Sequence, residues 1–237
     1  MISIWIFLLL GLVATGIIDA SAQVYDPLQR KSQLVWSLGE GLQPGDVFVY
    51  RICDAYLRIP ESPDPCYVVQ MHFLNLLDGI EGKTWIVSAH VDHKIRQLDM
   101  IFHIVADSFS IRTDRQSIQY AQSIERTLQW IGKYASKHEP QSLRIGSIWG
   151  IVPSDSPTSN DLIVSQIDSI KIQNTRYDTY KVTYLLIKES FLQIKDEFPF
   201  PITAHAYKPV STHQNVPLAF SFELVSYENY TMCSYNK

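Results

Sequence analysis

The stretches YVVQMHF (67–73) and TWIVSAHV (84–91) decide the fold class of this chain. In both, apolar and polar side chains alternate with a period of two, which is the pattern of a strand with one buried face. Asp78 to Lys83 (DGIEGK) lies between them and supplies two glycines for a turn. The two runs therefore predict a β-hairpin. Its apolar face would carry Tyr67, Val69, Met71 and Phe73 with Trp85, Val87, Ala89 and Val91.

Further strand-like runs stand on both sides of this hairpin. Short polar links join them, which favours an antiparallel meander over alternating strands and helices. The candidates are Val47 to Ile52, Ile101 to Ile111, Leu143 to Val152, Leu162 to Ile172, Tyr177 to Ile187, Phe191 to Lys195 and Leu218 to Val225.

Gln116 to Ala135 departs from the strand pattern, because its apolar residues recur at steps of three and four. Asp114 stands where a helix N-cap is expected. We predict an α+β fold, in which a curved antiparallel sheet or half-barrel of about 8–10 strands is covered by one long amphipathic helix. Residues 23–237 would form a single domain. A split near Pro153 is the alternative, since 153–161 is rich in Ser, Pro and Asp.

The N-terminus has the pattern of an export signal. Ile2 to Ile18 contain no charged side chain, and Ala20-Ser21-Ala22 offers small residues at alternate positions. Residues 1–22 are thus predicted to be a signal peptide that is cleaved after Ala22. The alternative is an uncleaved membrane anchor, since the apolar run approaches the roughly 20 residues that span a bilayer. Either way we expect an extracellular or cell-envelope location, with membrane contact only through this segment.

Composition and motifs disfavour several classes of partner and activity. The 20 basic and 24 acidic residues are interspersed, so no basic stripe is present for nucleic acid. The HExxH, GxxxxGK[ST] and GxGxxG motifs do not occur. These observations favour a non-enzymatic binding or interaction protein without a cofactor. A hydrolase of unfamiliar type remains an alternative, because a dispersed triad assembles only in the fold.

The chain contains three cysteines. Cys53 and Cys66 lie at the end of one predicted strand and the start of the next, with a proline-rich loop between them. Antiparallel neighbours of this kind can approach to bridging distance, so we predict a disulfide between them. Two free buried thiols are the alternative, and Cys233 would lie in a C-terminal tail outside the fold.

Four histidines lie close together along the chain, and His72 and His90 share the polar face of the predicted hairpin. Imidazole is a favoured ligand of Cu(II) and Zn(II), so a metal site is one hypothesis. Ordinary surface histidines are the alternative. The candidate metal ligands are His72, His90, His93 and His103.

A curved sheet closed by a helix can also hold an apolar ligand between its two layers. Filling a core is the more frequent role of the aromatic residues that would line this space. They are Tyr180, Tyr184, Phe220 and Phe222. Separately, Asn229-Tyr230-Thr231 has the form of an N-glycosylation acceptor, with Asn229 as the modified residue.

At four places the chain resembles uncharacterised secreted proteins of ammonia-oxidising archaea (Nitrososphaerota). These are GDVFVYRICD (45–54), Cys66-Tyr67, GKTWIV (82–87) and FPFP (198–201). The family has no assigned activity to transfer to any residue. The resemblance implies export and agrees with paired cysteines at positions 53 and 66. It also favours copper among the metals, because such organisms depend on copper enzymes outside the cytoplasm.

Overall fold

A computed structural model of the chain describes residues 34–60, 62–79, 82–114, 118–134, 140–150, 161–208 and 217–229. The predicted signal segment, Cys233 and most of 153–161 lie outside these ranges. The elements are β1 (Val35–Trp36), β2 (Asp46–Asp54), β3 (Cys66–Gly79), β4 (Gly82–His93), β5 (Arg96–Val105), β6 (Ile111–Thr113), α1 (Ile118–Tyr134), β7 (Gln141–Ser142), β8 (Ile148–Trp149), β9 (Leu162–Ile172), β10 (Thr175–Tyr184), β11 (Phe191–Ile194), β12 (Thr203–Tyr207) and β13 (Leu218–Asn229).

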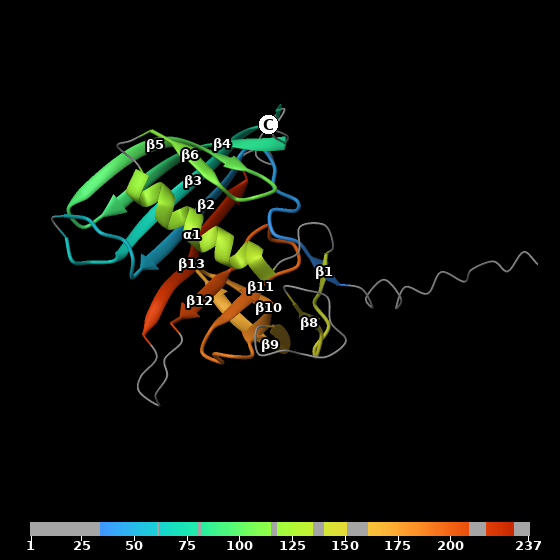
Figure 1. The fold of residues 1–237 in the computed structure, drawn as a ribbon. Helices are drawn as coiled ribbons and strands as arrows, with labels where there is room; N and C mark the ends of the chain where they lie inside the picture. The colour runs from blue at the N-terminus through green and yellow to red at the C-terminus, as the bar shows by residue number, and fades with distance from the viewer. Residues whose placement is uncertain are drawn as a thin grey trace, which may run out of the picture.

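Strands β2 to β6 and β8 to β13 form one 11-stranded sheet in the order β6-β5-β4-β3-β2-β13-β12-β11-β10-β9-β8 (Figure 1). Within each half of this order, strands that follow one another along the chain are neighbours, and every pairing is antiparallel. The two halves join where β2 pairs with β13, with Tyr50 opposite Leu224. One sheet thus contains strands from both sides of the segment 151–160.

The predicted hairpin is confirmed by β3 and β4, which pair with Met71 opposite Ala89. Their apolar side chains are buried, and we call the face of the sheet that carries them the inner face. Gln70 and His90 lie on the other, outer face, and they also stand opposite each other. The alternation seen in the sequence therefore specified which side of this hairpin is buried. The buried residues are Tyr67, Val69, Met71, Phe73, Trp85, Val87, Ala89 and Val91.

Helix α1 lies across the inner face of the sheet (Figure 1). The Tyr120 ring contacts Tyr67 of β3 edge to face at 5.1 Å, and the Trp130 ring contacts Phe220 of β13 in the same way. Between these two points Ile124 and Leu128 are fully buried. The helix is held by its apolar stripe, as expected for an amphipathic segment on a sheet.

The predicted α+β class, with a long amphipathic helix covering the sheet, is wrong. The fold is mostly antiparallel β, and the sheet has 11 strands rather than about 8–10. A helix does form within 116–135, but it has only 17 residues. At about 1.5 Å per residue it is about 25 Å long, whereas eleven strands at about 4.8 Å spacing extend over about 48 Å. The helix is therefore too short to cover the sheet.

A second structure covers part of the inner face that α1 does not reach. Strand β1 pairs with β7 in a two-stranded sheet, and Trp36 of β1 stacks on Trp149 of β8 at 5.9 Å. Trp36 Nε1 donates a hydrogen bond of 2.7 Å to the carbonyl oxygen of Phe198. This part of the inner face is therefore covered by β1, which is hydrogen-bonded to the FPFP stretch.

Some predicted strand boundaries are corrected. The run Ile101 to Ile111 is two strands, because a turn follows Val105 in which the Phe109 amide donates to the Val105 carbonyl at 2.8 Å. Within the described part of the predicted run Leu143 to Val152, strand β8 occupies two residues, Ile148–Trp149. Strand β12 was missed, since TAHAY is short and carries small residues at its buried positions.

Candidate functional site

A pocket of about 360 Å³ lies between the inner face of β3 to β5 and the segment 37–42. Its volume falls at the lower end of the range for small-molecule sites. Most of its lining is apolar. The residues that form its walls include Leu38, Phe73, Trp85, Ile104, Phe109 and Phe200.

The segment 37–42 is fixed in place by backbone hydrogen bonds. The Gly39 amide donates to the Pro199 carbonyl at 2.6 Å, and the Glu40 amide donates to the Ser37 carbonyl at 3.2 Å. Gly39 has φ of 79°, in the left-handed region where a side chain is disfavoured. Glycine at this position therefore allows the tight turn that forms one wall of the pocket.

The FPFP stretch supplies a second wall. Phe200 meets Phe48 edge to face at 5.4 Å and lies 5.7 Å from Phe73, measured between ring centroids. The next residue, Pro201, accepts a hydrogen bond of 3.0 Å from the buried hydroxyl of Tyr50. The aromatic wall is thus anchored to β2 and β3, and the pocket is largely preformed.

Phe109 closes the pocket from the turn between β5 and β6. Its φ of 52° is unusual for a bulky residue and costs about 1–3 kcal/mol. Helix α1 approaches this ring at Gly132, where an added Cβ would lie 3.3 Å from Phe109 and 3.4 Å from Leu38. Glycine in the last turn of the helix thus provides space for two pocket residues. Strain of this kind is concentrated at binding sites in other proteins.

Two carboxylates, Glu40 and Asp107, stand at the rim of the pocket. Both side chains are exposed to solvent. No basic side chain is among the residues that line the pocket in the described structure. This charge distribution disfavours an anionic ligand and permits an uncharged one.

The structure does not bring the four candidate metal ligands together. His93 lies on the inner face of β4, whereas His90 lies on its outer face. His103 is four positions along β5 from Asp99, the residue opposite His90, which is about 13 Å of strand. His72 stands opposite Ser88 rather than a histidine. In the described ranges no three His, Cys, Asp or Glu side chains are placed to hold one metal ion.

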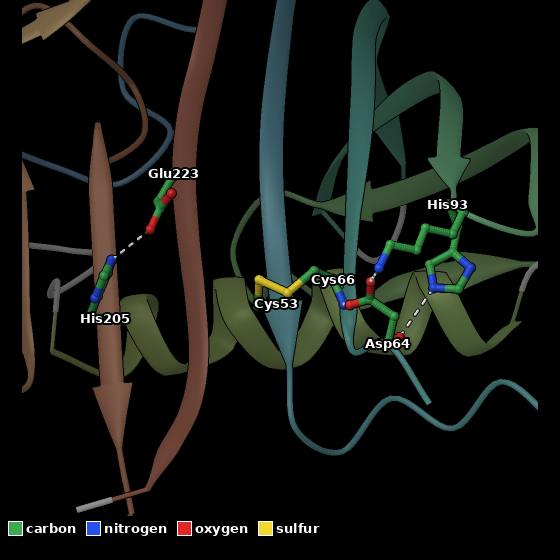
Figure 2. The surroundings of a disulfide bond; sticks show 7 residues. Cys53, Asp64, Cys66, His93, His205 and Glu223 are labelled. Atoms are coloured by element: carbon green, nitrogen blue, oxygen red, sulfur yellow. Dashed lines mark hydrogen bonds and ion pairs between the residues drawn. A yellow bond between two sulfur atoms is a disulfide. The ribbon is translucent and has the colours of Figure 1, made fainter. Parts of the chain in front are cut away.

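His90 and His93 interact with different groups. His90 Nδ1 lies 2.6 Å from Asp99 Oδ1 in an exposed pair. His93 Nε2 donates to the Asp64 carbonyl at 3.1 Å (Figure 2). His93 is almost completely buried, and its other ring nitrogen has no hydrogen-bond partner within the described structure. This histidine therefore packs under the Cys66 end of β3 rather than facing an open site.

The aromatic residues predicted to line a ligand space do not line this pocket. Phe222 is fully buried and stacks on Tyr50 at 3.8 Å. Phe220 lines a separate pocket beside α1. Tyr180 and Tyr184 pack, half-buried, against the hydrophobic core. The alternation in β3 and β4 identified Phe73 and Trp85 as buried, but no local signal indicated that they border a cavity.

Cys53 and Cys66 form a disulfide between directly opposed residues of β2 and β3, with their Cα atoms 4.0 Å apart (Figure 2). The predicted pairing is confirmed. The bond lies on the outer face, away from α1 and the pocket. It links the end of β2 to the start of β3, next to Asp54, the last residue of β2.

Asn229, the predicted glycan acceptor, is the last residue of β13. Its Nδ2 donates to Asp46 Oδ1 at 2.5 Å, and Tyr227 Oη donates to the same oxygen at 3.0 Å. Asp46 is buried, so these donors stabilise a carboxylate that lacks water contact. The nitrogen that would carry a glycan is thus engaged in the folded structure. Thr231 lies outside the described residues.

No protein-family model matches the chain, and no curated protein matches it. Among solved structures, a candidate lipoprotein of Parabacteroides distasonis is 11% identical with a TM-score of 0.34, over 81% of this chain and 99% of the other. A candidate exported protein of Bacteroides fragilis with a YmcC-like fold is 6% identical with a TM-score of 0.34, over 82% and 100%. Similarities at this score carry no argument about function.

Within the described part of the chain, no helix has the length and apolar character needed to cross a membrane.

Proposed function

We propose that this chain is an exported, non-enzymatic protein that binds a small uncharged apolar ligand in the pocket between β3 to β5 and the segment 37–42. The observation that carries the proposal is the apolar lining of this pocket, which includes Phe73, Trp85 and Phe200. Binding of an apolar ligand against such walls is favourable because it removes apolar surface of both the ligand and the pocket from contact with water.

Two features of the molecule support export and selectivity. The Cys53–Cys66 disulfide is of the kind that persists in oxidising compartments, where exported proteins reside. The rim carboxylates of Glu40 and Asp107 repel anions, so fatty-acid carboxylates fit less well than alcohols, esters or hydrocarbons of similar size.

The test uses N-phenyl-1-naphthylamine, an uncharged apolar dye whose fluorescence rises when it leaves water. We expect saturable one-to-one binding to the purified protein. Replacing Ala106, which lines the pocket, by Trp fills part of the space, so Ala106→Trp is expected to abolish saturable binding.

The matched control is Ile101→Trp, which adds the same side chain to the outer face of β5, the strand that ends just before Ala106. Ile101 is 60% exposed there, so the substitution leaves the pocket unchanged and binding is expected to persist. Circular dichroism verifies that both variants are folded. Unchanged dye affinity in folded Ala106→Trp would contradict the proposal.

A further inference from the structure

A second pocket, of about 320 Å³, lies between α1 and the ends of β2, β12 and β13. It shares no lining residue with the first pocket. Its chemistry also differs, because its lining combines charged side chains of both signs with aromatic rings. Those that the argument uses are Asp54, Tyr56, Arg126, Trp130, Lys208 and Phe220.

One of the two cations in this pocket is neutralised by a buried carboxylate. Arg126 of α1 approaches Asp54 Oδ2 with Nη2 at 2.6 Å and Nε at 3.2 Å. The Asp54 side chain is 2% exposed, and the Tyr56 amide donates to its other oxygen at 2.8 Å. Asp54 and Arg126 thus form a closed pair with no net charge.

The second cation has no such partner. Lys208 Nζ lies 4.3 Å from the centroid of the Tyr56 ring, a cation–π contact. Among the described residues no ion pair to Lys208 is formed, and Asp54, already bound by Arg126, is the only carboxylate in the pocket lining. The three charged groups of the lining therefore sum to one positive charge. A net positive charge in a pocket favours an anion.

The walls favour a flat apolar body. The Trp130 and Phe220 rings meet edge to face at 5.1 Å, with an angle of 79° between their planes. Tyr56 is 52% exposed although Lys208 lies over its ring, so the uncovered part of the ring is available to a ligand. Aromatic walls bury a planar group without much loss of side-chain entropy.

We propose that this pocket binds an organic monoanion with an aromatic or other flat apolar body. The anionic group faces Lys208 and the exposed edge of Arg126, and the body packs between Trp130, Phe220 and Tyr56. The site is independent of the uncharged-ligand pocket, and the two differ in the sign of the charge at their openings.

The test compares two dyes that share one skeleton. 1-Anilinonaphthalene-8-sulfonate carries a sulfonate, and N-phenyl-1-naphthylamine is the same molecule without it. We expect the sulfonate to bind the wild-type protein and to bind about tenfold or more weakly to Lys208→Gln, because one charge-assisted contact is lost. Lys188→Gln, which removes an exposed lysine elsewhere, serves as the matched control and is expected to bind like wild type.

Two further measurements locate the bound anion. In ¹H–¹⁵N spectra the indole signal of Trp130, assigned with Trp130→Phe, is expected to shift with the sulfonate dye, whereas the Trp85 signal is expected to shift with the uncharged dye. Added salt is expected to weaken only the sulfonate. Equal sulfonate affinity in wild type and Lys208→Gln, or a shift of Trp85 instead of Trp130, overturns the inference.

The two proposals fail separately. Loss of uncharged-dye binding in Ala106→Trp with sulfonate binding intact supports both sites. If the uncharged dye does not bind the wild type but the sulfonate shifts Trp130, the proposed function is wrong and the anion site stands.

Discussion

Asp54 of β2 and Arg126 of α1 are joined by an ion pair of 2.6 Å between Oδ2 and Nη2. This is the main polar contact between the helix and the sheet that the structure describes. The carboxylate is 2% exposed and the guanidinium 41%, so only the acidic partner has left water. Arg126 of the helix neutralises the charge of this carboxylate, and the Tyr56 amide donates to its other oxygen.

Arg126→Ala is expected to lower the free energy of unfolding by about 2 kcal/mol, because it leaves Asp54 buried without a cation. The loss is smaller than for a fully buried pair, since Arg126 is partly exposed. Urea denaturation measures it. Arg144→Ala, at an exposed loop position, is the control and should leave stability unchanged. Equal denaturation midpoints for both variants would show that the ion pair does not hold the helix.

Tyr120→Phe is expected to leave stability unchanged or to raise it by up to about 1 kcal/mol. The Tyr120 ring packs against Tyr67, and its buried hydroxyl has no hydrogen-bond partner in the described structure. The hydroxyl therefore loses its contact with water on folding without a replacement, and its removal takes away that free-energy cost. Tyr50→Phe is the matched control. The Tyr50 hydroxyl donates to Pro201, so its loss should cost about 1 kcal/mol. Thermal unfolding that ranks the two variants in the opposite order would refute this.

Replacing both Cys53 and Cys66 by Ser is expected to lower the free energy of unfolding by about 3 kcal/mol. The disulfide closes a loop with a sequence separation of 13 and restrains the unfolded chain. Non-reducing peptide mapping should recover these two cysteines in one linked pair. Cys233→Ser is the control and should unfold like wild type. A peptide that links Cys233 to either of the others would show that the pairing in solution differs.

The free energy of unfolding at acid pH should depend on Asp64. The Lys94 ammonium, 2.7 Å from its carboxylate, and the Cys66 amide lower the pKa of Asp64 below the ordinary value of 3.8. Because the folded pKa is below the unfolded one, the carboxylate stabilises the fold above about pH 4 and this contribution is lost as pH falls through the lowered pKa. Denaturation from pH 2 to 5 should show a shallower dependence in Asp64→Asn. Asp168→Asn, on β9, is the control, and parallel curves for all three proteins would exclude the effect.

The local parts of the fold could be predicted because the residues that decide them are close along the chain. The β3–β4 hairpin follows from alternation in two runs joined by a short turn. The Cys53–Cys66 pairing follows from the loop that joins two strand ends. The helix within 116–135 follows from its three- and four-residue steps. How much of the sheet it covers could not be predicted, because the width of the sheet that its 17 residues would have to cover was not known from the sequence.

The candidate sites could not be predicted in the same way. His72 and His90 share a face, as their alternation indicated, but strand register sets them opposite Ser88 and Gln70 rather than each other. Alternation reports the face of a residue and says nothing about register. The resemblance to archaeal secreted proteins stays a prediction, and so does the cleavage after Ala22.

The sequence by itself determined which residues are buried in β3 and β4, because burial of one face imposes a period of two on a strand wherever it pairs. Only the tertiary structure decided that β2 pairs with β13, 181 positions apart where Tyr227 reaches Asp46. It also decided that the Gly39 amide donates to the Pro199 carbonyl, which holds Gly39 in the wall of a pocket. These contacts depend on the free energy of closing long loops and packing whole layers together, and no single segment of the chain encodes them.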